Sequence, residues 1–319
     1  MSEPARVVEE HEPVGAALAR AAAMMVAASA IIAVTSLLAK ALGRGVQGSA
    51  LHPFQVTAGR FGFALALVLV VSIWLRPRLA GAAWPMHVGR TLCGWAGVTC
   101  MFAAAAAMPL AEATAISFLS PLATMILAIP LLGERVGPIR WSAAAVAVIG
   151  ALVLIRPGTA AYQAAALIAL AAAAFIGMEA ILVKRLSDRE PPMRILLINN
   201  AIGALLAVTA ATFVWTAPSP SQWAMLATLG ISMLGAQALF IQALRVADAS
   251  YVVPFFYTTL VFAALYDMAL FGDWPDLWSQ LGIAIILAGA MLLAWRERRL
   301  REARSATLPT GTTRDPAQR

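Results

Sequence analysis

Long runs of apolar residues, separated by short polar connections, dominate this sequence. A helix needs about 20 mostly apolar residues to cross the hydrocarbon core of a bilayer. Ten runs are candidates, at residues 17–38, 54–75, 88–108, 111–132, 141–155, 162–183, 195–216, 223–244, 251–271 and 277–295. The pattern predicts an all-α integral membrane protein with ten transmembrane helices.

The connections between the runs are short and rich in proline and glycine, which favour turns. The turn residues are Pro109, Gly133, Pro138, Pro157, Gly158, Pro191, Pro192, Pro218, Pro220 and Pro275. Such connections make neighbouring helices antiparallel and leave no room for a soluble domain. Two tails remain, a short one at residues 1–16 and a basic one at residues 296–319.

Composition supports a membrane location over a soluble fold. Hydrophobic residues make up 61% of the chain and charged residues only 12%, against roughly a quarter charged in an average soluble domain. The formal net charge of +7 could suggest nucleic acid as a partner. The basic residues form no patch interleaved with aromatics, so we expect no nucleic-acid binding. Their placement between the apolar runs instead indicates how the chain is oriented in the membrane.

The distribution of Lys and Arg predicts the orientation. Of the 23 basic residues, 19 fall on the side of the two tails, and Lys40, Arg44 and Arg156 fall on the other side. Arg60 lies within a run. Because cytoplasmic segments carry the excess of Lys and Arg, we expect both termini in the cytoplasm of a multi-pass inner-membrane protein. The N-terminal stretch has no cleavage site of a signal peptide, so the first run should remain as a helix.

An internal repeat relates the two halves. A shift of 139 residues takes Leu131 to Leu270 and Glu134 to Asp273, each at a Leu-x-Gly-acid stop, with a glycine in the next run at the same distance. Five runs per repeat is an odd number, so the halves should sit in the membrane with opposite orientation. This is the inverted-repeat architecture of many secondary transporters.

These segments resemble the EamA family of the drug/metabolite transporter superfamily over nearly the whole chain. The segment from Pro109 to Pro121 (PLAEATAISFLSP) is similar to the third-to-fourth helix region of that family, and Leu131 to Arg135 (LLGER) to its most recognisable stretch. Arg60 matches the arginine that the family often carries near the start of helix two. The second half departs from the pattern, with Asp273 in place of glutamate.

The resemblance implies a fold and a function. It implies two five-helix units, residues 17–157 and 158–295, in a permease that moves a small organic metabolite by alternating access. Amino acids, vitamins such as riboflavin, and nucleoside-like or drug-like compounds are the expected substrate classes, without a cofactor. The expected partners are that metabolite and membrane lipids, in a monomer or a homodimer.

Ionisable residues within membrane runs are costly and are functional candidates. Arg60, Glu112, Glu179 and Asp267 are therefore candidates for coupling or gating. The alternative is that all of them are shallow, with Asp267 reaching headgroups and Glu179 paired with a lysine or arginine at its helix end. Arg60 could pair with either of the two outer acids, Glu112 or Asp267.

Polar and aromatic residues within the runs predict a substrate site near the midplane. The candidates are Trp95, Ser117, Ser120, Glu179, Gln237 and Tyr257. They lie on the third, fourth, sixth, eighth and ninth runs, which face the central cavity in the family that the sequence resembles. Serine often serves only in helix packing, which is the alternative for Ser117 and Ser120.

Two other classes of protein compete with a transporter. An intramembrane enzyme would need a nucleophile with a base, or a metal cluster, inside the bundle. All three histidines lie in tails or at helix ends, and Cys93 and Cys100 lack metal-ligand spacing. A channel would need a filter motif or a ring of like charges, and neither is evident.

Overall fold

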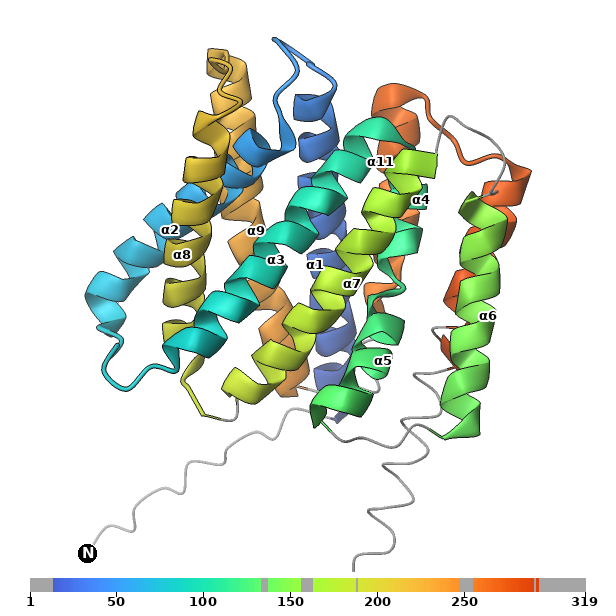
Figure 1. Ribbon diagram of the computed structural model, residues 1–319, viewed down its shortest axis with the longest axis horizontal. Helices are drawn as coiled ribbons and strands as arrows, with labels where there is room; N and C mark the ends of the chain where they lie inside the picture. Colours follow the sequence, from blue (N-terminus) through green and yellow to red (C-terminus); the bar gives the residue numbers. More distant parts are fainter. Residues whose placement is uncertain are drawn as a thin grey trace, which may run out of the picture.

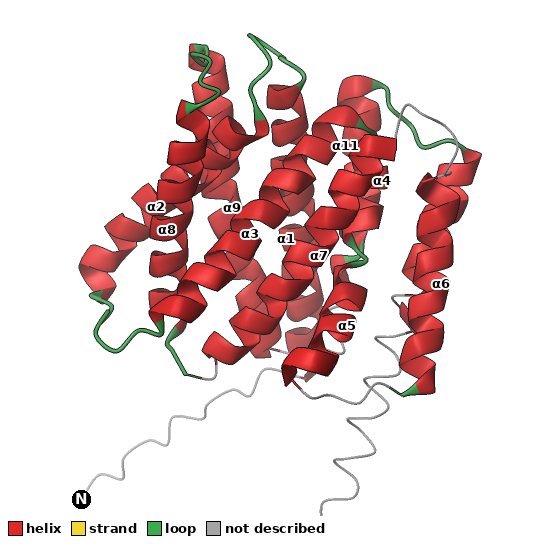
Figure 2. Ribbon diagram, viewed as in Figure 1, coloured by secondary structure: helices red, strands yellow, loops and turns green. Residues whose placement is uncertain are grey.

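A computed structural model describes residues 14–132, 137–155, 163–187, 189–246, 255–289 and 291–292. These residues form helices and connecting loops without a strand (Figure 2). The helices are α1 (Val14–Gly43), α2 (Pro53–Leu75), α3 (Trp84–Ala107), α4 (Leu110–Ser117), α5 (Ser120–Leu132), α6 (Pro138–Ile155), α7 (Gln163–Ser187), α8 (Pro192–Thr212), α9 (Pro220–Val246) and α11 (Thr258–Phe271). A last apolar helix spans Leu277–Gly289.

The outer surface of the bundle is largely apolar, as contact with lipid requires. Six helices are long and apolar enough to cross a membrane within the described residues. Large apolar side chains face outward along α2, α6, α8 and α11, for example Leu205 and Val261. A soluble monomer rarely exposes so much contiguous apolar surface, whereas lipid solvates it directly. The protein is therefore a multi-pass membrane protein.

Exposed tryptophans gather at the two ends of the bundle. One group lies where α2 joins α3 and where α6 begins, and the other lies where α8 joins α9 and α11 joins the last helix. The members are Trp74, Trp84 and Trp141 at one end, and Trp215, Trp223, Trp274 and Trp278 at the other. Indole rings favour the membrane–water interface, so the two groups mark the two faces of the bilayer.

The two halves of the chain interlock. The main helix contacts join α1 to α9 and α11, α2 to α8, and α3 to α7, so each joins the first half to the second (Figure 1). A small residue lets α6 approach the last helix closely, since a Cβ at Gly150 would lie 2.6 Å from the backbone nitrogen of Ile286. The two halves therefore form one interlocked bundle rather than two separate units.

The helices differ from the predicted runs in three places. The run predicted at 111–132 is interrupted between α4 and α5, and the run at 251–271 is interrupted at Tyr257. Lys40, taken from the sequence as a residue of a connection, lies within α1 and is buried. Residues 14–16 of the predicted N-terminal tail belong to α1. The rest of that tail, the predicted C-terminal tail, the stop residue Glu134 and the part of the ninth run before residue 255 lie outside the described residues.

Candidate functional site

Arg90 and Glu179 join the two halves inside the bundle, and a third charged side chain, Arg60, acts on both. The Arg90 Nη2 atom lies 3.1 Å from the Glu179 Oε1 atom, which joins α3 to α7. Arg60 on α2 is close enough to interact electrostatically with both of them. Arg60 is seven residues from the start of α2, and Glu179 is eight residues from the end of α7, so each lies about 10 Å inside its helix. We call Arg60, Arg90 and Glu179 the central triad.

The polar groups around the central triad have unused hydrogen-bonding capacity. Arg90 is only 8% exposed, yet its Nε and Nη1 atoms have no hydrogen-bond partner. The Thr91 hydroxyl and the Trp95 indole N–H, one turn apart on α3, also have none. Buried polar groups are normally satisfied, so a set of orphaned donors at one place calls for an explanation such as a ligand or water. The Glu179 side chain is 22% exposed, so solvent can reach the triad.

Local sequence determines the position of Glu179 against α3. A Cβ atom at Gly94 would lie 2.8 Å from the Glu179 Cδ atom, so only glycine leaves space for the carboxylate there. One residue further on, the Trp95 ring stacks on Phe54 of α2 with 5.6 Å between the ring centroids. Trp95 thereby links α3 to α2 one residue beyond the glycine that faces Glu179.

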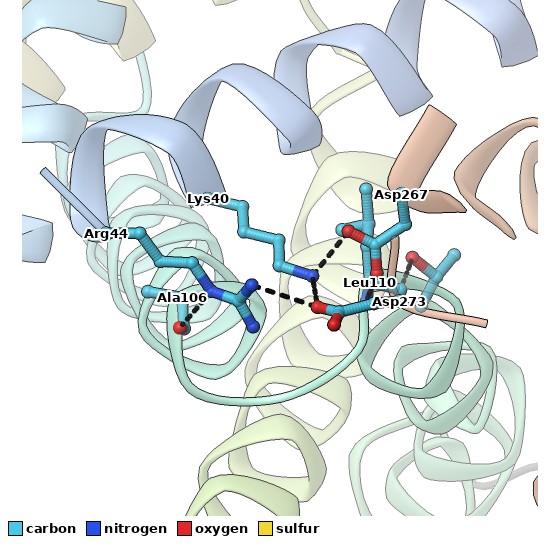
Figure 3. Close-up of polar contacts among 7 residues, drawn as sticks. Lys40, Arg44, Ala106, Leu110, Asp267 and Asp273 are labelled. Atoms are coloured by element: carbon cyan, nitrogen blue, oxygen red, sulfur yellow. Dashed lines mark hydrogen bonds and ion pairs between the residues drawn. The ribbon is translucent and has the colours of Figure 1, made fainter. Parts of the chain in front are cut away.

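A second group of charges closes the end of the bundle where α1 and α11 finish (Figure 3). Lys40 donates to Asp267, and its Nζ atom also lies 2.8 Å from Asp273 Oδ2. Arg44 Nη1 lies 2.9 Å from the same Asp273 oxygen. The other Asp267 oxygen accepts a hydrogen bond of 2.7 Å from the backbone N–H of Leu110, at the start of α4. We call Lys40, Arg44, Asp267 and Asp273 the end cluster.

In the end cluster, unlike the central triad, the buried charged groups have hydrogen-bond and ion-pair partners. Lys40 and Asp267 are almost completely buried, and each has at least two partners. Burial raises the pKa of Asp273, but the hydrogen bonds and charges of Lys40 and Arg44 outweigh it and hold that pKa below its usual value. A neighbouring contact, from the Ser279 hydroxyl to Glu112 at 2.6 Å, ties α4 to the last helix at the same end.

The opposite end has its own contact between the halves. Glu190, in the loop between α7 and α8, accepts a hydrogen bond of 2.6 Å from the backbone N–H of Ala83. Its other oxygen lies 2.6 Å from His87 Nε2 at the start of α3. Burial raises the pKa of Glu190, but the hydrogen bonds from Ala83 and His87 and the charge of Arg194 hold it below its usual value.

Two helix interruptions face each other in the interior. The first lies at Phe118 and Leu119, between α4 and α5, and the second at Tyr257 before α11. The rings of Phe118 and Tyr257 meet edge to face with centroids 5.2 Å apart. The shift of 139 residues found in the sequence takes position 118 to position 257, so the interruption recurs at equivalent residues.

Each interruption has a chemical cause or compensation. Proline at 121 has no N–H, so the carbonyl of Ser117 cannot accept the hydrogen bond of a regular helix. At the second interruption the Ser29 hydroxyl lies 3.3 Å from the Phe256 carbonyl and the Thr259 hydroxyl 2.7 Å from it. Backbone groups inside a membrane need such partners when the helix ladder is broken.

Five of the six predicted lining residues lie near the central triad or at the helix interruptions. Trp95 and Glu179 lie at the central triad, whereas Tyr257 lies at the second interruption. Ser117 and Ser120 flank the first interruption, and the Ser117 hydroxyl donates to the Thr114 carbonyl. Gln237 lies half-buried on α9. A pocket of about 350 Å³ opens elsewhere, between α2, α8 and α9 beside Trp215 and Trp223, and contains none of the predicted residues.

The pairing of the predicted ionisable residues differs from the sequence-based alternatives. Arg60 lies with Glu179 and Arg90, and the two outer acids have other partners. Glu179 contacts Arg90, while Arg185 donates to the carbonyl of Leu131. The side chain of Lys184, the other candidate partner of Glu179, lies outside the described residues.

The sequence analysis missed Lys40, Arg44 and Arg90, because it counted all three as topology signals. Arg90 already lies inside the predicted run 88–108, and that position could have identified it as an intramembrane charge. Among the described residues, no group of three His, Cys, Asp or Glu side chains could hold a metal ion, and Cys93 and Cys100 are both free thiols.

Comparisons with known proteins agree with this architecture. The sequence model of the EamA-like transporter family matches residues 19–156 and again residues 163–295. The S-adenosylmethionine uptake transporter of Rickettsia prowazekii is 29% identical over 79% of this chain and 86% of its own length. The riboflavin transporter of Rhizobium johnstonii is 30% identical over 75% of this chain and 79% of its own length.

Two further similarities broaden the comparison. The pseudopaline exporter of Pseudomonas aeruginosa is 26% identical over 74% of this chain and 83% of its own length. A protein of known crystal structure superposes with a TM-score of 0.60, covering 87% of this chain and 99% of that protein at 22% sequence identity, which shows a shared fold. The named relatives are transporters of small molecules, and they include an uptake transporter and an exporter.

Proposed function

Since the chain belongs to the EamA-like transporter family, it is a small-metabolite transporter, and we propose that it is a secondary transporter that works by alternating access. The location that fits best is the bacterial inner membrane, with both termini in the cytoplasm. The excess of Lys and Arg on the side of the tails supports this orientation. The relatives are named as transporters, which points away from an enzyme.

The proposed architecture has ten spans arranged as two inverted five-helix repeats. Two observations support it. The family model matches the chain twice, once in each half. The interruption at Phe118 recurs at Tyr257, the residue that the internal repeat makes equivalent to it. Paired discontinuous helices near the midplane are typical of transporters built from inverted repeats.

The single observation that carries the mechanism is the end cluster. It joins α1 of the first half to α11 of the second half through Lys40 and Asp267, both almost fully buried. These contacts close one end of the bundle above the central triad. The contact at the other end, between Glu190 and His87, is formed in the same structure. Alternating access therefore requires each end to open in turn while the other stays closed.

In this mechanism Glu179, Arg60 and Trp95 contact the substrate, Ser117, Ser120, Gln237 and Tyr257 line its path, and Asp267 and Glu112 belong to the outer closure. A channel remains the second candidate among non-enzymes. Counterflow separates the two, because only a carrier accelerates uptake of labelled substrate when unlabelled substrate is present inside.

The test uses purified protein in proteoliposomes, loaded with or without unlabelled riboflavin, S-adenosylmethionine or an amino acid mixture. A carrier gives saturable uptake that rises with internal substrate. Linear, unsaturated uptake that ignores internal substrate would favour a channel and contradict alternating access. An Asp267→Asn variant, in which the outer closure is weakened, should retain binding while its counterflow falls.

A further inference from the structure

We propose that the central triad is an anion site, and that the transported molecule is a small organic compound held by its carboxylate. This inference rests on the proposed transport function and names the substrate class for it. The observations behind it are the charges of the triad, the orphaned donors beside it, and the contrast with the satisfied end cluster.

The charges at the site favour an anion. Arg60 and Arg90 each carry a positive charge, and Glu179 carries one negative charge, so the triad as a whole is positive by one. An uncompensated charge inside a membrane protein is expensive, and one carboxylate would neutralise it. The end cluster needs no such addition, because its two basic and two acidic side chains balance.

The hydrogen bonds at the site also favour an anion. Arg90 uses Nη2 for Glu179, which leaves the N–H groups of Nε and Nη1 without partners. They lie on opposite sides of the planar guanidinium fork, so each can donate a charge-assisted hydrogen bond to a carboxylate oxygen. The Trp95 indole N–H is a donor only, and it too lacks a partner. Donors therefore outnumber acceptors, which is the reverse of what a cation would need.

The site is also built rather than incidental. Arg60 and Arg90 are each 8% exposed, and Thr91 is fully buried. Helices of both halves provide the side chains, α2 and α3 from the first and α7 from the second. A bound carboxylate would thus contact elements that move relative to each other during alternating access.

Matched carboxylate and carboxamide probes test the charge requirement directly. We would measure binding by thermal shift on the purified protein with nicotinate against nicotinamide, indole-3-acetate against its amide, and glutamate against glutamine. The expected result is stabilisation by at least one carboxylate, with its amide binding about tenfold or more weakly, as expected for loss of a charge-assisted hydrogen bond. If the amides bind as well as the carboxylates, or if no carboxylate stabilises the protein, the anion site is overturned.

Variants of the triad predict effects of opposite sign. Arg90→Gln should weaken binding of the responsive carboxylate about tenfold or more, because the triad becomes neutral and the fork is lost. Glu179→Gln should strengthen binding, because the triad then has two positive charges. Arg78→Gln, which removes an exposed arginine from the loop between α2 and α3, is the matched control and should leave binding unchanged.

Further measurements keep the proposal falsifiable. If Arg90→Gln does not fold, Arg90→Lys retains the charge without the planar fork and should bind with intermediate affinity. Equal affinity of the wild type, Arg90→Lys and Glu179→Gln would refute the site. Counterflow with the same probes separates the two proposals. Carboxylate binding without counterflow would contradict transport, whereas counterflow of amides alone would contradict only the anion site.

Discussion

The replacement Asp267→Asn should open the end of the bundle that the end cluster closes. Lys40 is completely buried and contacts Asp267, which is itself 1% exposed. Removing one partner of a buried ion pair costs about 3–5 kcal/mol, because the remaining charge stays uncompensated. Asp273 still lies 2.8 Å from Lys40, so we take the lower value, about 3 kcal/mol. Asparagine still offers an oxygen to the N–H of Leu110, so the effect isolates the charge.

The expected change in the conformational equilibrium is large. Each 1.4 kcal/mol is a factor of ten, so about 3 kcal/mol raises the ratio of open to closed forms on the order of 100-fold. Asp273→Asn is the matched control, because it removes the same charge from a residue whose side chain is 31% exposed. Such a partly exposed pair contributes only about 0–1 kcal/mol, so its effect should be less than about tenfold.

Cysteine labelling measures this opening. Ala33 is buried and packs with Leu110 and Ala263, and it lies two turns inward of Lys40 on α1. In a Cys93→Ser, Cys100→Ser background, Ala33→Cys would be labelled in intact cells with a membrane-impermeant maleimide. Labelling should be slow in this parent and much faster after Asp267→Asn. Equal labelling of the Asp267→Asn and Asp273→Asn variants would refute the view that the buried pair closes this end.

Three further predictions concern the packing, the pH dependence and the helix interruption. Gly94→Ala should displace Glu179 and impair transport in proteoliposomes, whereas Gly89→Ala, whose Cβ would lie an ordinary 3.7 Å from its neighbour, should not. The pKa of Glu190 is held below its usual value of about 4.3. The melting-temperature advantage of the wild type over Glu190→Gln should therefore be present above about pH 5 and be lost in stronger acid, as the carboxylate becomes protonated. Pro121→Ala should restore a helical hydrogen bond, raising thermal stability while slowing transport. A lower or unchanged melting temperature in that variant would contradict the role given to the proline.

The fold class could be predicted because lipid imposes a simple rule on sequence. A segment that crosses hydrocarbon must satisfy its backbone internally and present apolar side chains, so long apolar runs are read directly as helices. The family was predictable from the segment from Leu131 to Arg135, which resembles the most recognisable stretch of the EamA family. The interruption at Phe118 followed less directly, although Pro121 offered a signal. In the second half, the position equivalent to Pro121 carries Leu260, so no proline marks the interruption at Tyr257. There a hydroxyl group from another helix, that of Ser29, contacts the carbonyl of Phe256.

The partners of the charged residues could not be predicted, because they depend on helix rotation. Arg60 and Arg90 lie 30 residues apart in sequence and enter from opposite ends of the bundle. Their approach to Glu179 depends on how α3 packs against α7, and Gly94 controls that contact. Lys40 was misassigned for a similar reason. The sequence alone placed the end of the first helix a few residues too early, and the lysine was counted with the loop that follows.

Hydrogen-bond satisfaction gives a physical criterion for separating a gate from a binding site in this protein. A gate must be stable by itself when it is closed, so its charges should be paired within the chain, as Lys40 and Asp267 are. A binding site must leave part of its capacity for the ligand, as Arg90 does. Filling the orphaned donors would remove the cost of burying them, so the ligand would stabilise whichever arrangement brings Arg60, Arg90 and Glu179 together. Because these residues belong to both halves, the proposed binding and the proposed movement would be coupled through the same three side chains.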